Sequence, residues 1–197
     1  SVKMLRYLAG LLVFLLATSV TFAQNYEAGQ AVADIITSPS DDRGYLAHRL
    51  KNGLRVLLIS DPHTDKAAAA LDVRVGSGSD PEERPGLAHL LEHMLFLGTE
   101  QYPEAGEYQA FIQQHGGSDN AYTMPDHTNY YFDIQSQYLR GALERFSQFF
   151  VAPLFNPRFV ERERGVVHAE FSAKLKSDGR RYLAARRQAF DPRHPES

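Results

Sequence analysis

The spacing of apolar residues changes along this chain, and that change restricts the fold more than any other feature. Residues 46–50 and 54–59 are rich in apolar side chains and flank Asn52-Gly53, a dipeptide that favours a hairpin turn. Residues 67–75 then alternate apolar and polar side chains, as in a strand with one buried face. Residues 118–134 read as a further extended segment. These segments predict β-strands, beginning with an antiparallel pair.

Between and after these strands, apolar residues recur at the three- and four-residue spacing of a helix. The spacing predicts helices over residues 87–97, 104–114, 139–150 and 157–176, with a shorter helix near the C-terminus. Strands that cluster first and then alternate with helices indicate an α+β fold. We expect a mixed, largely antiparallel β-sheet with helices packed on it.

The composition excludes several classes of function. The chain has 197 residues, and 43% of them are hydrophobic and 23% charged, as in ordinary globular proteins. It has no cysteine, so disulfides, thiol nucleophiles and cysteine zinc sites are excluded and any metal must be held by His, Asp or Glu. The formal net charge is −3 and no basic stripe occurs, so no nucleic-acid partner is expected.

The N-terminus resembles a secretory signal. Lys3 and Arg6 are followed by an apolar run over residues 8–20, and small residues at 21 and 23 predict cleavage before Gln24. The alternative is a membrane anchor, although a span needs about 20 apolar residues. Such a signal would direct the protein across an inner membrane into a bacterial periplasm. Its cleavage would leave the protein without stable membrane association.

One five-residue motif concentrates the chemistry, His89-Leu-Leu-Glu92-His93. On a helix, His89 and His93 lie about 40° apart and Glu92 about 60° from His89, so all three share one side. Two imidazoles at this spacing can bind one zinc ion, and Glu92 is placed to take a proton from a water activated by the metal. We expect Leu90, Leu91, Met94 and Leu95 to anchor the helix in the core. The alternative is an apolar helix with two structural histidines.

A catalytic zinc site needs a third protein ligand and one open position. The helix predicted after residue 157 offers Glu161, Glu163 and Glu170. Glu163 and Glu170 are seven residues apart and therefore share a helical face. Spacing does not choose among the three, and such glutamates also occur on ordinary solvated faces.

Three blocks resemble one known family. Residues 89–99 read HLLEHMLFLGT, residues 116–134 read GGSDNAYTMPDHTNYYFDI, and residues 162–171 read RERGVVHAEF. In this order, they resemble the pitrilysin and insulin-degrading-enzyme family of zinc metallopeptidases. The resemblance extends from about Leu46 to the end of the chain.

The resemblance implies a role for each residue of the site. It implies one zinc ion per chain, with Glu170, 77 residues after His93, as the third ligand. It implies that Glu163 orients the ligands by hydrogen bonds. It also implies that residues 120–122 (Asn120, Ala121 and Tyr122) form an edge strand that pairs with the backbone of a peptide substrate. The expected activity is that of a zinc metalloendopeptidase on short unfolded peptides. The other histidines are interpreted as surface or structural residues.

The resemblance also suggests the domain organisation: a signal at 1–23, a leader or linker at 24–42, and an N-terminal zinc-binding peptidase domain at 43–197 that is incomplete at its C-terminus. Family members have two homologous halves around a chamber. A missing C-terminal half would therefore complete the active site, and we expect the 197 residues alone to cleave poorly. The alternatives are a non-catalytic peptide-binding or scaffold subunit, a processing peptidase for targeting peptides, and a globular domain with a fortuitous motif.

Overall fold

The computed structural model describes residues 30–31 and 35–190. The chain forms two compact units, and the boundary between them lies between residues 63 and 64. The predicted signal at 1–23 lies outside the described residues. Within the described ranges, no helix combines the length and the apolar character needed to cross a bilayer.

The first unit contains one small antiparallel sheet. Its strands follow the order β1 (Gln30–Ala31), β2 (Gly44–Arg49) and β3 (Arg55–Ser60). The loop between β2 and β3 is closed where the N–H of Leu50 donates to the carbonyl of Leu54 at 2.9 Å. Gly53 has φ of 89°, a left-handed conformation that glycine adopts without a steric penalty. The predicted hairpin is therefore confirmed.

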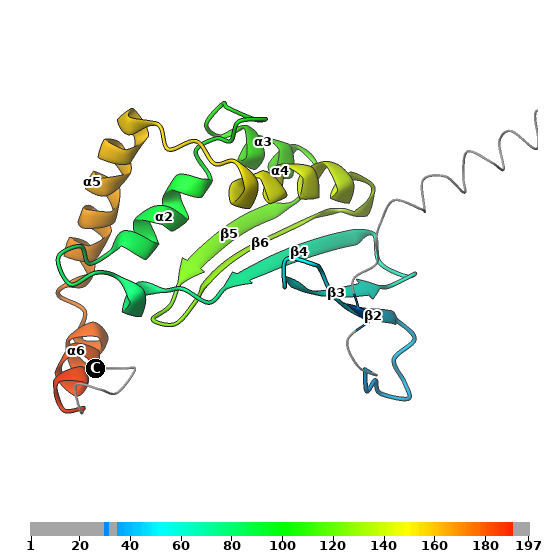
Figure 1. Cartoon of the computed structure of the whole chain (residues 1–197), viewed down its shortest axis with the longest axis horizontal. Helices are drawn as coiled ribbons and strands as arrows, with labels where there is room; N and C mark the ends of the chain where they lie inside the picture. The colour runs from blue at the N-terminus through cyan, green and yellow to red at the C-terminus, as the bar shows by residue number, and fades with distance from the viewer. Residues whose placement is uncertain (1–29, 32–34, 191–197) are drawn as a thin grey trace, which may run out of the picture. The chain divides into compact units, whose positions relative to one another are not determined.

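The second unit places helices against a three-stranded antiparallel sheet (Figure 1). The strand order is β4 (Lys66–Val73), β6 (Thr128–Gln135), β5 (Ser118–Thr123). The α-helices are α2 (Leu87–Leu95), α3 (Glu107–Gln114), α4 (Leu139–Val151), α5 (Pro157–Lys174) and α6 (Asp178–Gln188), and short 3-10 turns occupy η1 (Ser77–Ser79) and η2 (Ser136–Tyr138). This confirms the α+β class. Every strand pair of the described residues is antiparallel.

The core of the second unit lies between β6 and the helices α3 and α4. Alternate residues of β6 are buried, and Phe132 is 1% exposed. Its ring lies 5.3 Å from that of Phe146 on α4 and 6.4 Å from that of Tyr108 on α3, measured between ring centroids. Leu95 of α2 belongs to the same cluster. The core therefore holds the motif-bearing helix as well as the sheet.

Replacing Phe132 with Ala is expected to lower the free energy of unfolding by about 3–5 kcal/mol, because the change leaves a cavity among aromatic rings. Tyr131→Ala is the matched control, since Tyr131 immediately precedes Phe132 in the strand, points to the opposite face and is 39% exposed. Its loss should be clearly smaller. Denaturant titration followed by circular dichroism measures both values. Equal losses would contradict the position of the core.

Candidate metal centre

Helix α2 is fixed in place at its start and along one face. The carboxylate of Asp80 accepts hydrogen bonds from the backbone N–H of Gly86 at 2.7 Å and of Ala88 at 2.8 Å. Gly86, with φ of 93°, is the residue that turns the chain into the helix. A carboxylate at this position also interacts favourably with the helix dipole. The start of α2 is thus held by a residue outside the helix.

The core anchors that we expected on α2 are confirmed only in part. Met94 and Leu95 are buried, as predicted. The prediction for Leu91 was wrong, because this side chain is 44% exposed. The helix is covered by the sheet and by α5 rather than on all sides, so its remaining face reaches the surface. Leu87, one turn earlier, is exposed in the same way.

The approach to α2 is tied to the turn between β5 and β6. The N–H of Ser77 donates to the carbonyl of Met124 at 2.9 Å, and the N–H of Gly78 donates to the carbonyl of Pro125 at 2.8 Å. Ser77 and Gly78 belong to η1, which precedes α2. These bonds set the position of the motif helix relative to the end of β5.

The structure brings His89, His93 and Glu170 together as one group of potential metal ligands. The Nε2 atoms of the two histidines lie 3.2 Å apart. Oxygens of Glu170 lie 3.6 Å from Nε2 of His89 and 3.9 Å from Nε2 of His93. Ligand atoms of a tetrahedral zinc ion lie about 3.4 Å from one another. The donor types and their separations therefore fit one zinc ion.

Helix α5 carries the three glutamates among which sequence spacing could not choose a third ligand, and the structure gives each of them different surroundings. Its start is capped by Asn156, whose side chain accepts from the N–H of Arg158 at 3.0 Å. Glu170 reaches the two histidines, whereas Glu163 is buried, with 8% of its surface exposed. Glu161 points to solvent and pairs with Arg164 at 2.8 Å. The packing of α5 on α2 thus brings Glu170, and not Glu161, into the group of potential metal ligands with the two histidines.

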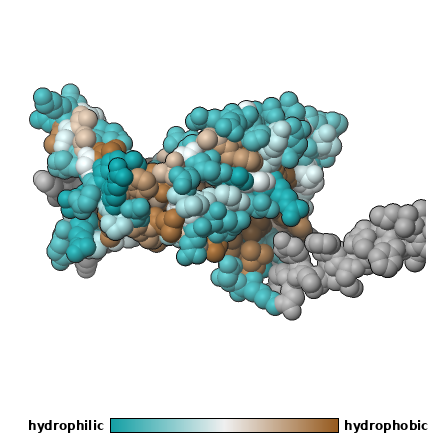
Figure 2. Space-filling view, turned by 90° about the horizontal axis from the view of Figure 1, so that it is seen from above, coloured by the Kyte–Doolittle hydropathy of each residue, from teal (hydrophilic) through white to brown (hydrophobic). Residues whose placement is uncertain are grey.

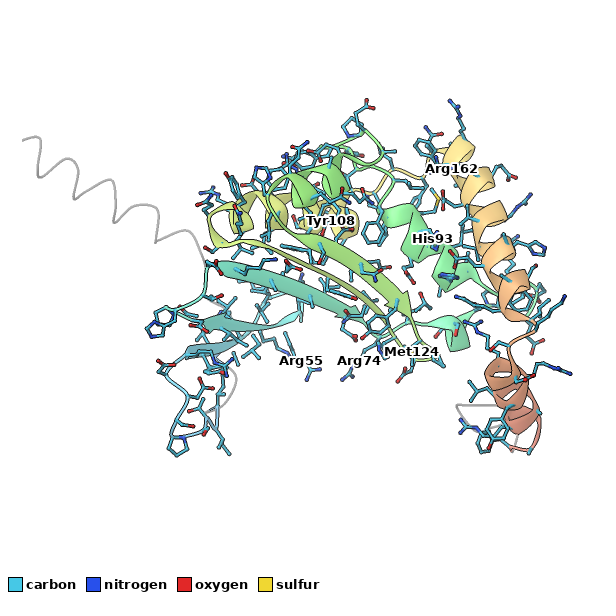
Figure 3. The ribbon with its side chains drawn as sticks, turned by 180° about the vertical axis from the view of Figure 1, so that it is seen from behind. Arg55, Arg74, His93, Tyr108, Met124 and Arg162 are labelled. Carbon is cyan, nitrogen blue, oxygen red and sulfur yellow. The ribbon has the colours of Figure 1, made fainter. Side chains whose placement is uncertain are left out.

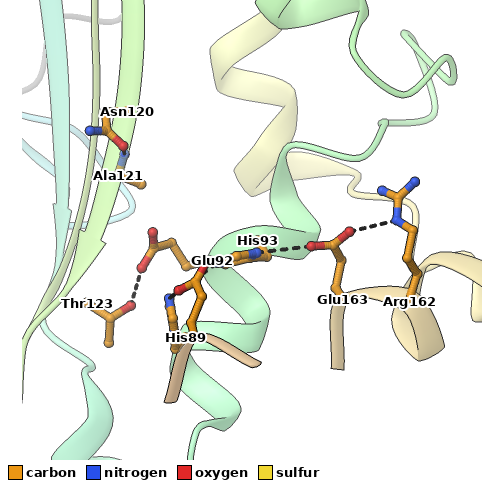
Figure 4. Close-up of polar contacts among 9 residues, drawn as sticks. His89, Glu92, His93, Asn120, Ala121, Thr123, Arg162 and Glu163 are labelled. Atoms are coloured by element: carbon orange, nitrogen blue, oxygen red, sulfur yellow. Dashed lines mark hydrogen bonds and ion pairs between the residues drawn. The ribbon is translucent and has the colours of Figure 1, made fainter. Parts of the chain in front are cut away.

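Glu163 links one histidine to a cation. Its Oε2 lies 3.0 Å from Nδ1 of His93, and its Oε1 accepts from Nε of Arg162 at 2.8 Å (Figure 4). Figure 3 shows His93 on α2 and Arg162 on α5. Burial raises the pKa of Glu163, but the hydrogen bonds from His93 and Arg162 outweigh this effect and hold the pKa below its ordinary value. An ionised Glu163 accepts the Nδ1 proton of His93, which leaves Nε2 with a free lone pair for a metal.

Glu92 lies on the same helix but is not part of the ligand group. Its carboxylate lies between α2 and β5 and accepts a hydrogen bond of 2.5 Å from the hydroxyl of Thr123 (Figure 4). Only 7% of the Glu92 surface is exposed. The Glu92 carboxylate is thus poorly exposed and lies on the same helix as two of the grouped ligands without being one of them. A carboxylate in such a position suits proton transfer. Thr123 was not predicted, although it lies within the block at residues 116–134 that also contains residues 120–122.

Strand β5 is an edge strand of its sheet. It pairs with β6 on one side, and no described strand pairs with its other side. Asn120 and Tyr122 are exposed, and the N–H of Ala121 donates to the side-chain oxygen of Asn120 at 2.9 Å. The structure therefore places all three predicted residues on one free edge. His127 and His168 lie outside the ligand group.

A family model matches this arrangement. Residues 55–190 match the model described as insulinase, peptidase family M16, and this match covers more than half of the chain and the whole ligand group. The chain therefore belongs to the insulinase family of peptidases.

Individual relatives agree with this assignment. The chain is 49% identical over 163 residues to insulin-degrading enzyme of Mus musculus, covering 83% of this chain and 16% of that protein. It is 47% identical over 154 residues to a Schizosaccharomyces pombe protein whose name contains the words zinc protease, covering 78% of this chain and 15% of that protein. A crystal structure of pitrilysin superposes with a TM-score of 0.79 at 40% identity, covering 86% of this chain and 18% of that one.

The chain thus spans about 16% of the length of the first of these relatives. The curated relatives named above come from eukaryotes, and the expected bacterial periplasm stays a prediction. Export by residues 1–23 stays a prediction.

Proposed function

We propose that this chain is the zinc-binding part of a zinc metalloendopeptidase. The observation that carries the proposal is the spacing of the His89, His93 and Glu170 donors, with Glu92 beside them on the same helix. A zinc ion in such a site supplies Lewis-acid activation of water and of a peptide carbonyl. Glu163 and Arg162 hold His93 in the tautomer that this role requires.

Glu92 acts as the general base and then as the general acid. Its carboxylate takes a proton from the attacking water and delivers it to the nitrogen of the leaving amine. No covalent intermediate with the protein is needed. The low exposure of Glu92 strengthens its electrostatic interactions, because less water screens the carboxylate.

We propose that the substrate is an unfolded peptide that adds to the free edge of β5. Main-chain hydrogen bonds to residues 120–122 would hold the peptide with little selectivity for its side chains. The N–H of Ala121, now bonded to Asn120, would become a donor to the peptide backbone. Figure 2 shows one face of the molecule, on which apolar residues lie among hydrophilic ones.

We also propose that a further part of the protein completes the active site. Its relatives are several times longer than this chain, and the described residues expose 31% of the His89 side chain and 39% of the Glu170 side chain. A second segment would cover the ligands, exclude water and supply groups that stabilise the developing oxyanion.

Zinc removal tests the proposed function. The purified whole protein, including the further part proposed above, is expected to contain one zinc ion per chain by elemental analysis and to cleave a quenched fluorescent peptide of unfolded conformation. Chelation should remove the metal and the cleavage together, and added zinc should restore both. Cleavage that persists without metal would refute the proposal. Bound zinc with peptide binding, but without cleavage by the whole protein, would favour the non-catalytic binding subunit.

A further inference from the structure

The hydroxyl of Thr123 connects the strand proposed to bind peptide with the proposed general base. Thr123 is the last residue of β5 and pairs with Thr128 of β6. Side chains alternate along a strand, so Thr123 shares its face with Ala121, which packs against the core. From this face the Thr123 hydroxyl donates to Oε2 of Glu92 at 2.5 Å. The contact joins residues 31 positions apart in the sequence.

We propose that Thr123 is a positioning residue for the general base, an inference that rests on the proposed function. A glutamate side chain has three rotatable bonds, and a hydrogen bond to one carboxylate oxygen restricts them. Since Oε2 already accepts the Thr123 hydroxyl, the proton from the attacking water goes to Oε1. Oε1 accepts no hydrogen bond from residues 30–31 or 35–190, so it is available for that proton. Thr123 thus assigns one oxygen to orientation and the other to proton transfer.

The same bond couples the base to the substrate strand. A peptide paired with residues 120–122 would be positioned by the backbone of β5, and the Glu92 carboxylate is positioned by a side chain of that same strand. The position of the scissile carbonyl relative to the base would therefore be set by one strand, β5. An error of about 1 Å in such an arrangement can lower the rate by about 100-fold.

Three variants test the positioning role in the whole protein. Thr123→Val keeps the shape of the side chain but removes the hydroxyl, and Thr123→Ser keeps the hydroxyl. Thr128→Val is the matched control, because the Thr128 hydroxyl donates to the carbonyl of Val75 at 2.8 Å and does not contact Glu92. We expect kcat to fall about tenfold or more in Thr123→Val with KM changed less than about twofold, and to be largely restored in Thr123→Ser. Thr128→Val should lower stability but leave kcat unchanged.

Two readouts do not depend on turnover. Zinc content should stay at the wild-type value in Thr123→Val, because Thr123 is not one of the three grouped ligands. A double-mutant cycle of Thr123→Val with Glu92→Ala, measured by unfolding of the metal-free protein, should show coupling on the order of tenfold in the unfolding constant.

The outcomes separate this inference from the proposed function. An active wild type with unchanged kcat in Thr123→Val, or equal losses in the Val and Ser variants, would overturn the positioning role alone. Absence of coupling in the unfolding cycle would overturn it as well. A wild-type protein that binds zinc but does not cleave peptide would refute the proposed function, and the positioning role with it.

Discussion

Replacing Glu92 with Gln is expected to lower kcat/KM by about 10²–10⁴-fold while one zinc ion stays bound per chain. Gln has almost the same shape as Glu, and its side-chain oxygen can still accept the Thr123 hydroxyl. The amide cannot take up a proton near neutral pH, so the transfer from water to leaving amine fails. The metal stays, because Glu92 is not one of the three grouped ligands.

Peptide cleavage and zinc content are measured on the same preparation of Glu92→Gln. Glu161→Gln is the control, since Glu161 is an exposed glutamate on α5 that pairs with Arg164. It should match the wild type in both measurements. Retained cleavage in Glu92→Gln would eliminate the general-base role, whereas loss of zinc would show that Glu92 holds the metal directly or indirectly.

Replacing His93 with Ala is expected to abolish stable zinc binding and, with it, all zinc-dependent cleavage. His93 supplies one of the three donors and is also the histidine bonded to Glu163. Its removal leaves two donors and deprives Glu163 of one of its two partners, so that only Arg162 remains. Two ligands from one histidine and one carboxylate do not complete a catalytic zinc site.

A series of three variants is expected to show graded zinc affinities. Glu163→Gln removes the negative charge behind His93 and should weaken zinc binding by about 10–100-fold without abolishing it. His127→Ala is the control, because His127 contacts Asp126 and Asp72 but does not belong to the ligand group. Competition with a chromophoric chelator measures the three affinities. A His93→Ala variant that binds zinc as tightly as His127→Ala would refute the assignment of His93.

Most of the secondary structure was predictable because it follows from local periodicity. The helices predicted at 87–97, 104–114, 139–150 and 157–176 end within three residues of the observed bounds. The extended segment at 118–134 became the hairpin of β5 and β6. The exposure of Leu91 was not predictable, because a helical pattern does not say which apolar residues a neighbouring element covers.

The same distinction applies to the metal centre. The pairing of His89 with His93, and the place of Glu92 beside them, follow from the geometry of a single helix. The choice of Glu170 could be made only from the family resemblance, because it depends on how two helices far apart in sequence pack. The structure supplies that packing: Glu170 lies at the histidines, Glu163 lies behind His93, and Glu161 faces solvent.

The periodicity of apolar residues and the residue types present were therefore enough to predict the motif helix, the hairpin and the α+β class. They also defined which donor types are available to a metal. The contacts of Asp80 with the start of α2, of Arg162 with Glu163 and of Thr123 with Glu92 became visible only in three dimensions. The physical reason is that backbone periodicity depends on neighbouring residues, whereas a hydrogen bond between side chains depends on where folding brings two distant segments. The Thr123 contact is of this second kind, and it joins the proposed base to the proposed substrate strand.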